Sequence, residues 1–401
     1  MEELLRHADR LNDQQDSMLA TITRLCEINS GTLNLVGVER VSSELVKLFE
    51  PLGGDLQLID TPPWSVVGDD GKRTEQPLGK IIHIIKHPDA EKKVMLCIHC
   101  DTVYGIDNDF QKCEMTPSGQ LNGPGVADAK GGLIVMLEAL KTLEASTLAG
   151  KIGWEVIINP DEEVGSPGSA SFLRSRAGSC DFGLLFEPAL PGGGLVSWRK
   201  GTGNFTFVVR GKSAHSGRDF ESGRNAIVAL ARLMDEIDQL NIEPDVTYNV
   251  GRITGGGAVN IVPELAVGRV NVRVCNLEQQ SGVEIDFADL VEKYNQIDGI
   301  SVELNGSFSS PPKALEENVK PLQHRITRCA EALGIDISWQ GTGGACDGNK
   351  FASAGLPNID TLGPCGGHIH SRHEFLIPES LVPRAKLASL ILLSYAAEAS
   401  D

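Results

Sequence analysis

The sequence lacks the features of several special classes of protein. Its longest apolar stretch near the C-terminus, LASLILLSYAA, is too short to span a bilayer and predicts a buried helix. It has no excess of basic residues: its formal net charge is −18, which argues against nucleic-acid binding. The N-terminus, MEELLRHADRLNDQQ, lacks the basic and apolar regions of a signal peptide. We therefore expect neither a nucleic-acid partner nor a membrane partner.

A disulfide framework is also not indicated. The nine cysteines are an odd number, are scattered and form no CxxC pair, so a reducing cytoplasm fits best. The remaining composition, 41% hydrophobic and 22% charged, is ordinary for a soluble globular protein. The length of 401 residues exceeds the size at which a single core stops growing, which predicts two domains.

The first half of the chain alternates between helix and strand patterns. Helices are predicted at about 16–28, 35–52 and 129–145, and strands at 79–87, 92–99, 151–159 and 181–188. This alternation is typical of an α/β architecture around a largely buried sheet.

The pattern changes after PGGG at 191–194. From there to SSPP at 309–312, strands and helices follow the order strand-helix-strand-strand-helix-strand, as in a small ferredoxin-like α+β unit. The earlier alternation then resumes and ends in a terminal helix. We therefore expect one domain built from residues 1–193 and 311–401, with a second domain, 194–310, inserted into it.

Three carboxylates stand side by side in NPDEEVGS, at residues 159–166. Asp161, Glu162 and Glu163 directly follow an apolar strand pattern. Such a cluster is usually a solvated turn. A divalent metal ion opposite the cluster is the alternative, because its charge would reverse the local electrostatics.

Two further motifs place polar residues next to a predicted strand or helix. In HCDTV, His99 and Asp101 are two residues apart and point to the same side of a strand, so Asp101 could fix the tautomer of a ligating His99. A hydrogen-bonded structural histidine is the alternative. In GPGVADAKGG, Asp128 precedes a helix, where it could be either a ligand or an N-cap.

The last two motifs supply one glutamate and three histidines. Glu187 ends the strand pattern LLFEP, and CGGHIHSRHEF contains His368, His370 and His373. Each of these motifs lies at or just beyond the end of a strand, or in the turn leading to a helix, and open α/β sheets form their sites at the carboxyl ends of the strands. Imidazoles and carboxylates converging there fit a two-metal site, for which zinc is best suited and manganese or cobalt remain open.

Taken in order, HCDTV, GPGVADAKGG, NPDEEVGS, FEP, GKSAHSG and HIHSRHEF resemble the M20 family of metallopeptidases over nearly the whole chain. The likeness is closest to the glutamate-carboxypeptidase branch; other relatives are aminoacylase, acetylornithine deacetylase and succinyl-diaminopimelate desuccinylase. The resemblance implies a zinc-exopeptidase-type catalytic domain with a central, mostly parallel sheet. The inserted domain would then serve as a lid and for dimerisation.

The resemblance also implies a ligand set. By it, His99 and Glu187 bind one zinc, Glu163 and His370 bind the other, and Asp128 bridges the two.

It further implies that Glu162 is the general base and that Asp101 supports His99. His370 is preferred over His368 because HSRHE matches the late histidine of the family. His373 stands where relatives often carry Asp, Asn or Lys. His368 and His373 are expected beside the site or on the surface. Asp161 is expected to be a support.

In the inserted domain, the resemblance implies that His215 of GKSAHSG crosses a dimer interface and hydrogen-bonds the oxyanion in the partner's site. Ser216 departs from the alanine usual in the family. Arg273 and Asn260 match positions that hold the substrate's carboxylate and carbonyl, although a solvated strand residue is the alternative for Arg273. Gly344, in a glycine-rich loop, would offer backbone groups.

We therefore expect a cytoplasmic homodimer with two zinc ions per subunit. It should cut an amide bond next to a free carboxylate, as a carboxypeptidase acting on small peptides or glutamate conjugates. An N-acyl-amino-acid deacylase is the nearest alternative. A tripeptidase-type aminopeptidase and a catalytically silent binding protein are weaker ones.

Overall fold

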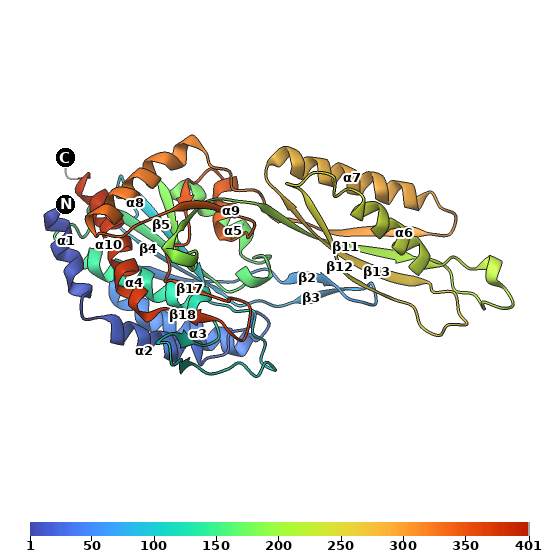
Figure 1. Cartoon of the computed structure of the whole chain (residues 1–401), viewed down its shortest axis with the longest axis horizontal. Helices are drawn as coiled ribbons and strands as arrows, with labels where there is room; N and C mark the ends of the chain where they lie inside the picture. Colours follow the sequence, from blue (N-terminus) through green and yellow to red (C-terminus); the bar gives the residue numbers. More distant parts are fainter. Residues whose placement is uncertain (400–401) are drawn as a thin grey trace.

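A six-stranded sheet forms the centre of the larger of two lobes in the computed structural model, which describes residues 1–399 (Figure 1). In spatial order its strands are β1 (Asp55–Ile59), β4 (Ile81–Lys86), β8 (Gly153–Asn159), β5 (Lys93–His99), β9 (Phe182–Leu185) and β16 (Asn358–Ile359). The pairs β8–β5, β5–β9 and β9–β16 are parallel, whereas β1–β4 and β4–β8 are antiparallel. The predicted α/β fold with a mostly parallel sheet is confirmed.

Both faces of this sheet are covered by helices, which explains why its strands are nearly continuous apolar runs. Along β5, Leu96 and Ile98 pack into the core on one face, and Met95 and Cys97 into the core on the other. The first face is covered by α1 (Glu2–Ala8), α2 (Gln15–Cys26), α3 (Leu35–Phe49), α4 (Gly132–Glu144), α8 (Lys320–Ala332) and α10 (Leu381–Ala397). The second is covered by α5 (Ala170–Arg176) and α9 (Asp347–Ser353).

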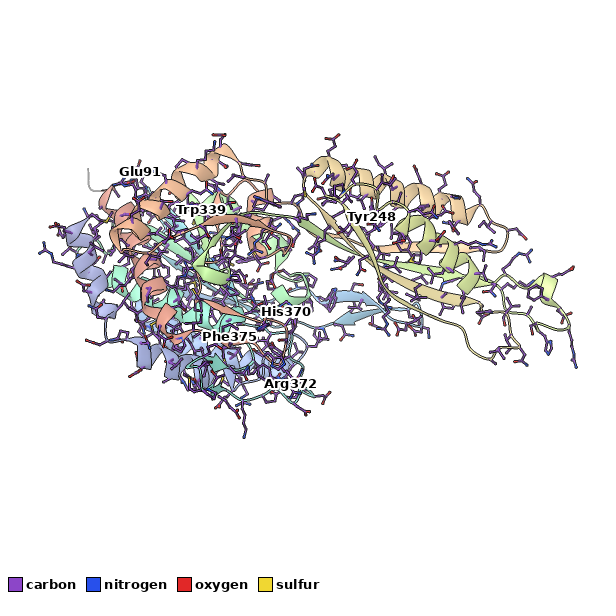
Figure 2. All side chains as sticks on the ribbon, viewed as in Figure 1. Glu91, Tyr248, Trp339, His370, Arg372 and Phe375 are labelled. Atoms are coloured by element: carbon purple, nitrogen blue, oxygen red, sulfur yellow. The ribbon has the colours of Figure 1, made fainter. Side chains whose placement is uncertain are left out.

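The smaller lobe is a four-stranded antiparallel sheet with two helices on one face (Figure 1). Its elements are β11 (Gly201–Arg210), α6 (Ala226–Asp238), β12 (Thr247–Gly255), β13 (Leu265–Val274), α7 (Leu277–Asn295) and β14 (Ser301–Ser310). The spatial order β12-β13-β11-β14 is the one expected of a ferredoxin-like unit. Phe287 of α7 packs edge to face on Phe205 and Phe207 of β11, with Tyr248 beside it (Figure 2).

The two connections between the lobes run side by side. Strand β10 (Leu195–Arg199) pairs in parallel with β15 (Trp339–Thr342), so the residues just after PGGG still belong to the larger lobe. The chain therefore enters the smaller lobe at Lys200, later than the residue 194 expected from the sequence. The sequence pattern does not show that residues 195–199 pair with residues 339–342 of the larger lobe. Asn349 Nδ2 donates to the carbonyl oxygens of Lys200 (3.1 Å) and Pro311 (2.8 Å), which fastens both connections to α9.

Two small sheets complete the fold. One consists of β17 (Gly366–Gly367), β18 (Phe375–Leu376), β7 (Leu121–Asn122) and β6 (Glu114–Met115), and it supports the turn that carries His370. The other is the hairpin of β2 (Trp64–Val67) and β3 (Arg73–Gln76), which reaches from the larger lobe to the smaller one (Figure 1). None of the helices within residues 1–399 combines the length and the hydropathy of a membrane span.

A buried ion cluster on β8 makes the stability of the larger lobe dependent on pH. Glu155 accepts hydrogen bonds from Arg176 (2.6 and 2.9 Å) and Ser179 (2.7 Å), and lies 2.8 Å from His83 Nε2. Burial opposes its charge, but these partners outweigh burial and lower the pKa of Glu155 to about 2. A depressed folded-state pKa stabilises the fold above the ordinary pKa of glutamate, and this contribution is lost as the pH falls toward 2.

Glu155→Gln should therefore lower the Tm at pH 7, by the equivalent of up to about 3 kcal/mol. The difference from the wild type should shrink between pH 4.5 and pH 2.5. In this range the unfolded wild-type chain binds a proton at Glu155 that the folded protein does not bind, which lowers the free energy of unfolding of the wild type. Thermal unfolding across this range measures it, with the exposed Glu75→Gln as the charge control. A Tm difference that stays constant with pH would contradict the assignment.

Candidate active site

Polar side chains gather at the carboxyl ends of the three central parallel strands. His99 is the last residue of β5, and Glu187 lies two residues beyond the end of β9. Glu162 and Glu163 open a short 3-10 turn, Glu162–Val164, that follows β8. This is the edge at which open α/β sheets form their sites, because neighbouring loops there leave a crevice.

Asp128, from the turn before α4, lies between the two histidines that were predicted as ligands. Its Oδ1 is 3.1 Å from His99 Nε2, and its Oδ2 is 3.1 Å from His370 Nε2. A second carboxylate completes each side: Glu187 Oε2 is 3.7 Å from His99 Nε2, and Glu163 Oε2 is 3.1 Å from His370 Nε2. The five predicted ligands thus form two sets, each with one imidazole, one glutamate and one oxygen of Asp128.

Asp101 orients both a ligand and the acidic turn. His99 Nδ1 lies 3.1 Å from the Asp101 carbonyl oxygen, which can only accept, so Nδ1 carries the proton and Nε2 is left free to bind a metal. The Asp101 carboxylate accepts from the backbone N–H groups of Glu162 (3.1 Å) and Glu163 (3.2 Å) and from the Thr32 hydroxyl (2.7 Å). The sequence predicted only its contact with His99.

The third acid of the cluster lies apart from these contacts. The buried Asp161 carboxylate accepts hydrogen bonds from the backbone N–H groups of Gly168 (2.6 Å) and Ser169 (3.1 Å), and from the Ser169 hydroxyl. These donors lie in the residues that follow the 3-10 turn. Asp161 therefore fastens this segment, which is the supporting role expected of it.

Burial and crowding disfavour the negative charges of the glutamates in this cluster. A divalent cation would offset both effects. Burial raises the pKa of Glu163 to about 7, helped by the charge of Asp128, and raises the pKa of Glu162 well above its ordinary value. Burial also opposes the charge of Asp128, but hydrogen bonds from His370 and His99 keep its pKa below the usual range. Ligand atoms of His99, Asp128 and Glu163 all lie within 4.8 Å of one another. Nitrogen and oxygen donors in this arrangement fit zinc, manganese or cobalt.

A residue that the sequence did not assign holds the central aspartate. Glu374 is buried and accepts from the backbone N–H groups of Gly125 (3.2 Å), Ala127 (3.0 Å) and Asp128 (3.0 Å), and from the Tyr104 hydroxyl (2.7 Å). One carboxylate thus fixes the whole turn that presents Asp128. Its position four residues after His370 was the only sequence signal, and that signal does not reveal a contact with a turn so far away in the chain.

Replacing this support should weaken metal binding without removing a ligand. In Glu374→Gln, the amide oxygen can still accept from Ala127 and Asp128, but the amide nitrogen in place of the other oxygen cannot accept from Gly125, so the turn carrying Asp128 loses part of its anchor. We expect metal affinity to fall by about 10- to 100-fold, as is typical for groups that orient ligands. Competition with a chelator measures this affinity. Unchanged affinity in a folded variant would show that the turn is held by other contacts.

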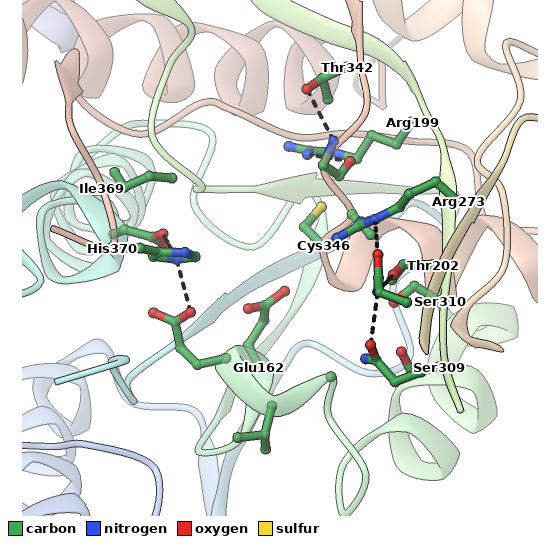
Figure 3. A pocket seen from close by; sticks show the side chains of 18 of the residues that line it. Glu162, Arg199, Thr202, Arg273, Ser309, Ser310, Thr342, Cys346, Ile369 and His370 are labelled. Carbon is green, nitrogen blue, oxygen red and sulfur yellow. Dashed lines mark hydrogen bonds and ion pairs between the residues drawn. The ribbon is translucent and has the colours of Figure 1, made fainter. Parts of the chain in front are cut away.

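The metal-site residues open into a cavity of ≈ 1120 Å³ that lies between the two lobes (Figure 3). Its wall on the larger lobe includes Glu162 and His370, and its wall on the smaller lobe includes Arg273. Figure 2 shows His370 on the side of the larger lobe that faces the smaller one. Among the described residues, no hydrogen-bond donor holds the Glu162 carboxylate.

The glycine-rich loop lines the same cavity beside Arg273. Gly344 accepts from Arg199 Nη1 (3.1 Å) through its carbonyl oxygen, and its N–H donates to Thr342 Oγ1 (3.3 Å). The Gly343 carbonyl oxygen accepts from Arg273 Nη1 (3.3 Å). The predicted contact of Gly344 with the substrate is therefore compatible with its place.

Two predicted residues are absent from the cavity of their own chain. His215 and Asn260 lie next to each other: Ser216 N–H donates to the Asn260 carbonyl oxygen (3.0 Å), and His215 forms a β-bridge with Ile261. The segment between β11 and α6, which carries His215, lies at the end of the smaller lobe far from the larger one (Figure 1). Neither residue can reach the metal site of the same subunit.

The two other histidines near the site are exposed. His368 lines the cavity, and His373 lies on the surface, with its backbone N–H bonded to Ser371 Oγ (3.2 Å). Both positions agree with the expectation that these histidines lie beside the site or on the surface.

Sequence comparison decides the family. Residues 95–394 match the sequence profile of peptidase family M20/M25/M40. The chain belongs to the M20 peptidase family. As a member of this family it is an enzyme of the hydrolase class.

Individual relatives agree with this M20 assignment. Carboxypeptidase G2 of Pseudomonas sp. (strain RS-16) is 28% identical over 380 residues, which cover 93% of this chain and 87% of that protein. The fold resembles a tripeptidase from Staphylococcus aureus (TM-score 0.75, 23% identity, covering 96% of this chain and 99% of the other). It also resembles a dinuclear metal-binding M20 peptidase of Bacillus subtilis (TM-score 0.66, 14% identity, covering 95% and 98%).

Proposed function

We propose that this M20 enzyme uses two zinc ions to cleave an amide bond next to a free carboxylate, as a carboxypeptidase acting on small peptides or glutamate conjugates. The observation that carries the proposal is the guanidinium of Arg273. Arg273 faces the same cavity as the metal-site residues, and its described hydrogen bonds go only to the neutral oxygens of Asn271 (3.1 Å) and Gly343 (3.3 Å). Burial lowers its pKa, but a guanidinium stays charged, so it would favour an anionic partner.

The other two arginines of the cavity already have carboxylate partners. Arg199 forms a two-point contact with Asp360 (2.9 and 2.7 Å), and Arg269 lies 2.8 Å from Asp69. A substrate carboxylate would therefore be drawn to Arg273, where no protein carboxylate competes among the described residues.

The two sets of ligands around Asp128 support a two-metal site. When bound, two divalent ions would supply Lewis-acid activation of a water molecule and of the scissile carbonyl group. Glu162 would take the proton of the attacking water and deliver it to the leaving nitrogen. Burial raises the pKa of Glu162 well above that of an ordinary glutamate, which makes its carboxylate a stronger base for the first of these tasks.

A substrate panel tests the proposal and its rivals. N-acyl amino acids, dipeptides and tripeptides are incubated with the enzyme and either zinc or manganese, and the products are identified. Release of a C-terminal amino acid from peptides supports the carboxypeptidase. Activity only on N-acyl amino acids would favour the deacylase, and release of an N-terminal residue from tripeptides would favour the aminopeptidase.

The distant place of His215 supports a dimer in which this residue serves the partner's site. Apolar residues around it, Phe220, Val259 and Ile261, are exposed, as is Ile369 at the rim of the cavity. A second copy packed through the smaller lobe would bury such residues and carry each His215 toward the other site. There it would donate a hydrogen bond to the developing oxyanion.

This arrangement predicts complementation. His215→Ala and Glu162→Gln should each be inactive alone, but the mixture should regain activity once subunits exchange. In each heterodimer one site then has both groups intact and the other lacks both. A mixture of Glu162→Gln with Glu163→Gln is the control and should stay inactive, because both residues serve their own subunit. If exchange is verified and the first mixture stays inactive, His215 does not act across the interface.

We also propose a cytoplasmic location. All nine cysteines lie within the described residues and are free thiols, several of them buried. Thiols persist in a reducing compartment, whereas secreted proteins commonly pair them. Fractionation of the source cells would test this.

A further inference from the structure

The hairpin β2–β3 forms a third link between the lobes, one that the sequence did not predict. It crosses the face of the smaller lobe's sheet that is free of helices (Figure 1). Its contacts reach all four strands: Arg252 of β12 and Arg269 of β13 pair with Asp69, Arg210 of β11 donates to the Gly71 carbonyl oxygen (2.8 Å), and Arg73 pairs with Glu303 of β14 (3.5 Å).

The tip of the hairpin lies directly on the sheet. Gly71 has φ +66°, and a Cβ at this position would lie 2.9 Å from Val208 Cγ1 and 3.1 Å from Leu265 Cδ1. There is thus no room for a side chain between tip and sheet. The ion pairs of Asp69 are partly exposed and contribute little. Close packing and charge-assisted hydrogen bonds to backbone carbonyls, including that from Arg269 to Val67 (2.9 Å), hold the hairpin.

The base of the hairpin lines the same cavity as the metal site. Residues 64–67 form part of its wall, together with Arg269 and Arg273 on β13. These two arginines are four residues apart and point to the same face of the strand, so about 13 Å separates them along the sheet. At Arg269 the hairpin is bonded to this sheet, since Arg269 Nη2 donates to the Val67 carbonyl oxygen, and it therefore bounds the cavity there.

We propose that the β2–β3 hairpin is the specificity wall of the cleft and restricts the acyl side of the substrate to short groups. This inference rests on the proposed function, in which Arg273 holds the substrate's carboxylate. With that end fixed and the bond to be cut beside Glu162, the acyl group would occupy the part of the same cavity that Trp64 and Val66 line. Acetyl groups and single residues fit in this space, whereas a chain of several residues runs into the hairpin.

The test compares glutamates acylated with acetyl, alanyl, trialanyl and pentaalanyl groups. The wild type should show kcat/KM at least about tenfold higher for the alanyl than for the pentaalanyl conjugate, typical of steric exclusion from a formed site. Gly71→Leu should lift the tip from Val208 and bring this ratio close to one. Gly119→Leu is the matched control: Gly119 also has a positive φ, +80°, but a Cβ added there would have no heavy atom within 4 Å. It should keep the wild-type ratio.

A second variant decides the question if Gly71→Leu fails to fold. In it, Ser65 and Glu75, which pair across the hairpin, are joined directly by an Asn-Gly turn, so that the tip is removed. This variant should bind metal normally and accept the pentaalanyl conjugate. If the shortened variant keeps the wild-type ratio of kcat/KM between the alanyl and pentaalanyl conjugates, the proposal that the hairpin is a specificity wall is wrong. It is also wrong if the wild type cleaves conjugates of every length equally well. A wild type that cleaves none of the conjugates would refute the proposed function itself, and the wall with it.

Discussion

Glu162→Gln should retain both metal ions and lose roughly two to four orders of magnitude in kcat. The reason is that the structure brings the five predicted metal ligands into contact with one another but leaves the Glu162 carboxylate facing the cavity. Glutamine keeps the shape of the side chain but cannot accept a proton. Metal analysis and steady-state kinetics on one substrate measure the two properties together.

Glu163→Gln is the matched control, because it makes the same chemical change one residue away. Glu163 lies 3.1 Å from His370 Nε2 on one side of Asp128, so its loss should lower the metal content along with activity. If Glu162→Gln loses metal and Glu163→Gln keeps it, the two roles must be exchanged. Near-normal turnover in metal-replete Glu162→Gln would end the assignment of the base.

Arg273→Ala should lower kcat/KM on free-acid substrates, and the fall should correspond to a loss of about 2–5 kcal/mol in transition-state binding. This is typical when one partner of a buried charge pair is truncated. Arg273 has no carboxylate partner among the described residues, so its charge remains available to the substrate. Substrates in which the carboxylate is amidated should already be poor and should lose little more.

The comparison of the two substrate types separates anchoring from a structural role. Arg273 also holds the Gly343 carbonyl oxygen (3.3 Å), so the variant could disturb the glycine-rich loop. A disturbed loop would lower the rates on free and amidated substrates equally. An equal loss on both would therefore show that Arg273 supports the loop and does not bind the carboxylate.

The sequence predicted the larger lobe well because its signals are local. Strands buried on both faces appear as apolar runs, and β5 with the histidine at its end is one of them. The rule that sites form at the carboxyl ends of parallel strands then placed His99, Glu163 and Glu187 at one edge. The structure brings these residues together with Asp128 and His370.

What the sequence did not reveal depends on contacts between distant segments. Glu374 holds a turn about 250 residues earlier in the chain, and β10 takes its partner from residues 339–342. The hairpin β2–β3 has mostly exposed or half-buried side chains, so no apolar pattern marked it. Its importance comes from a sheet that begins more than 120 residues later.

The most direct test of the central claim is a zinc titration. The enzyme is stripped with a chelator, zinc is returned in steps, and the release of glutamate from an N-acylglutamate is followed. The two ligand sets around Asp128 predict that activity is absent in the stripped enzyme and reaches its maximum at about two equivalents of zinc per subunit. Glutamate release that does not depend on added metal, or no release at full loading, would contradict a two-metal hydrolase that acts next to a free carboxylate.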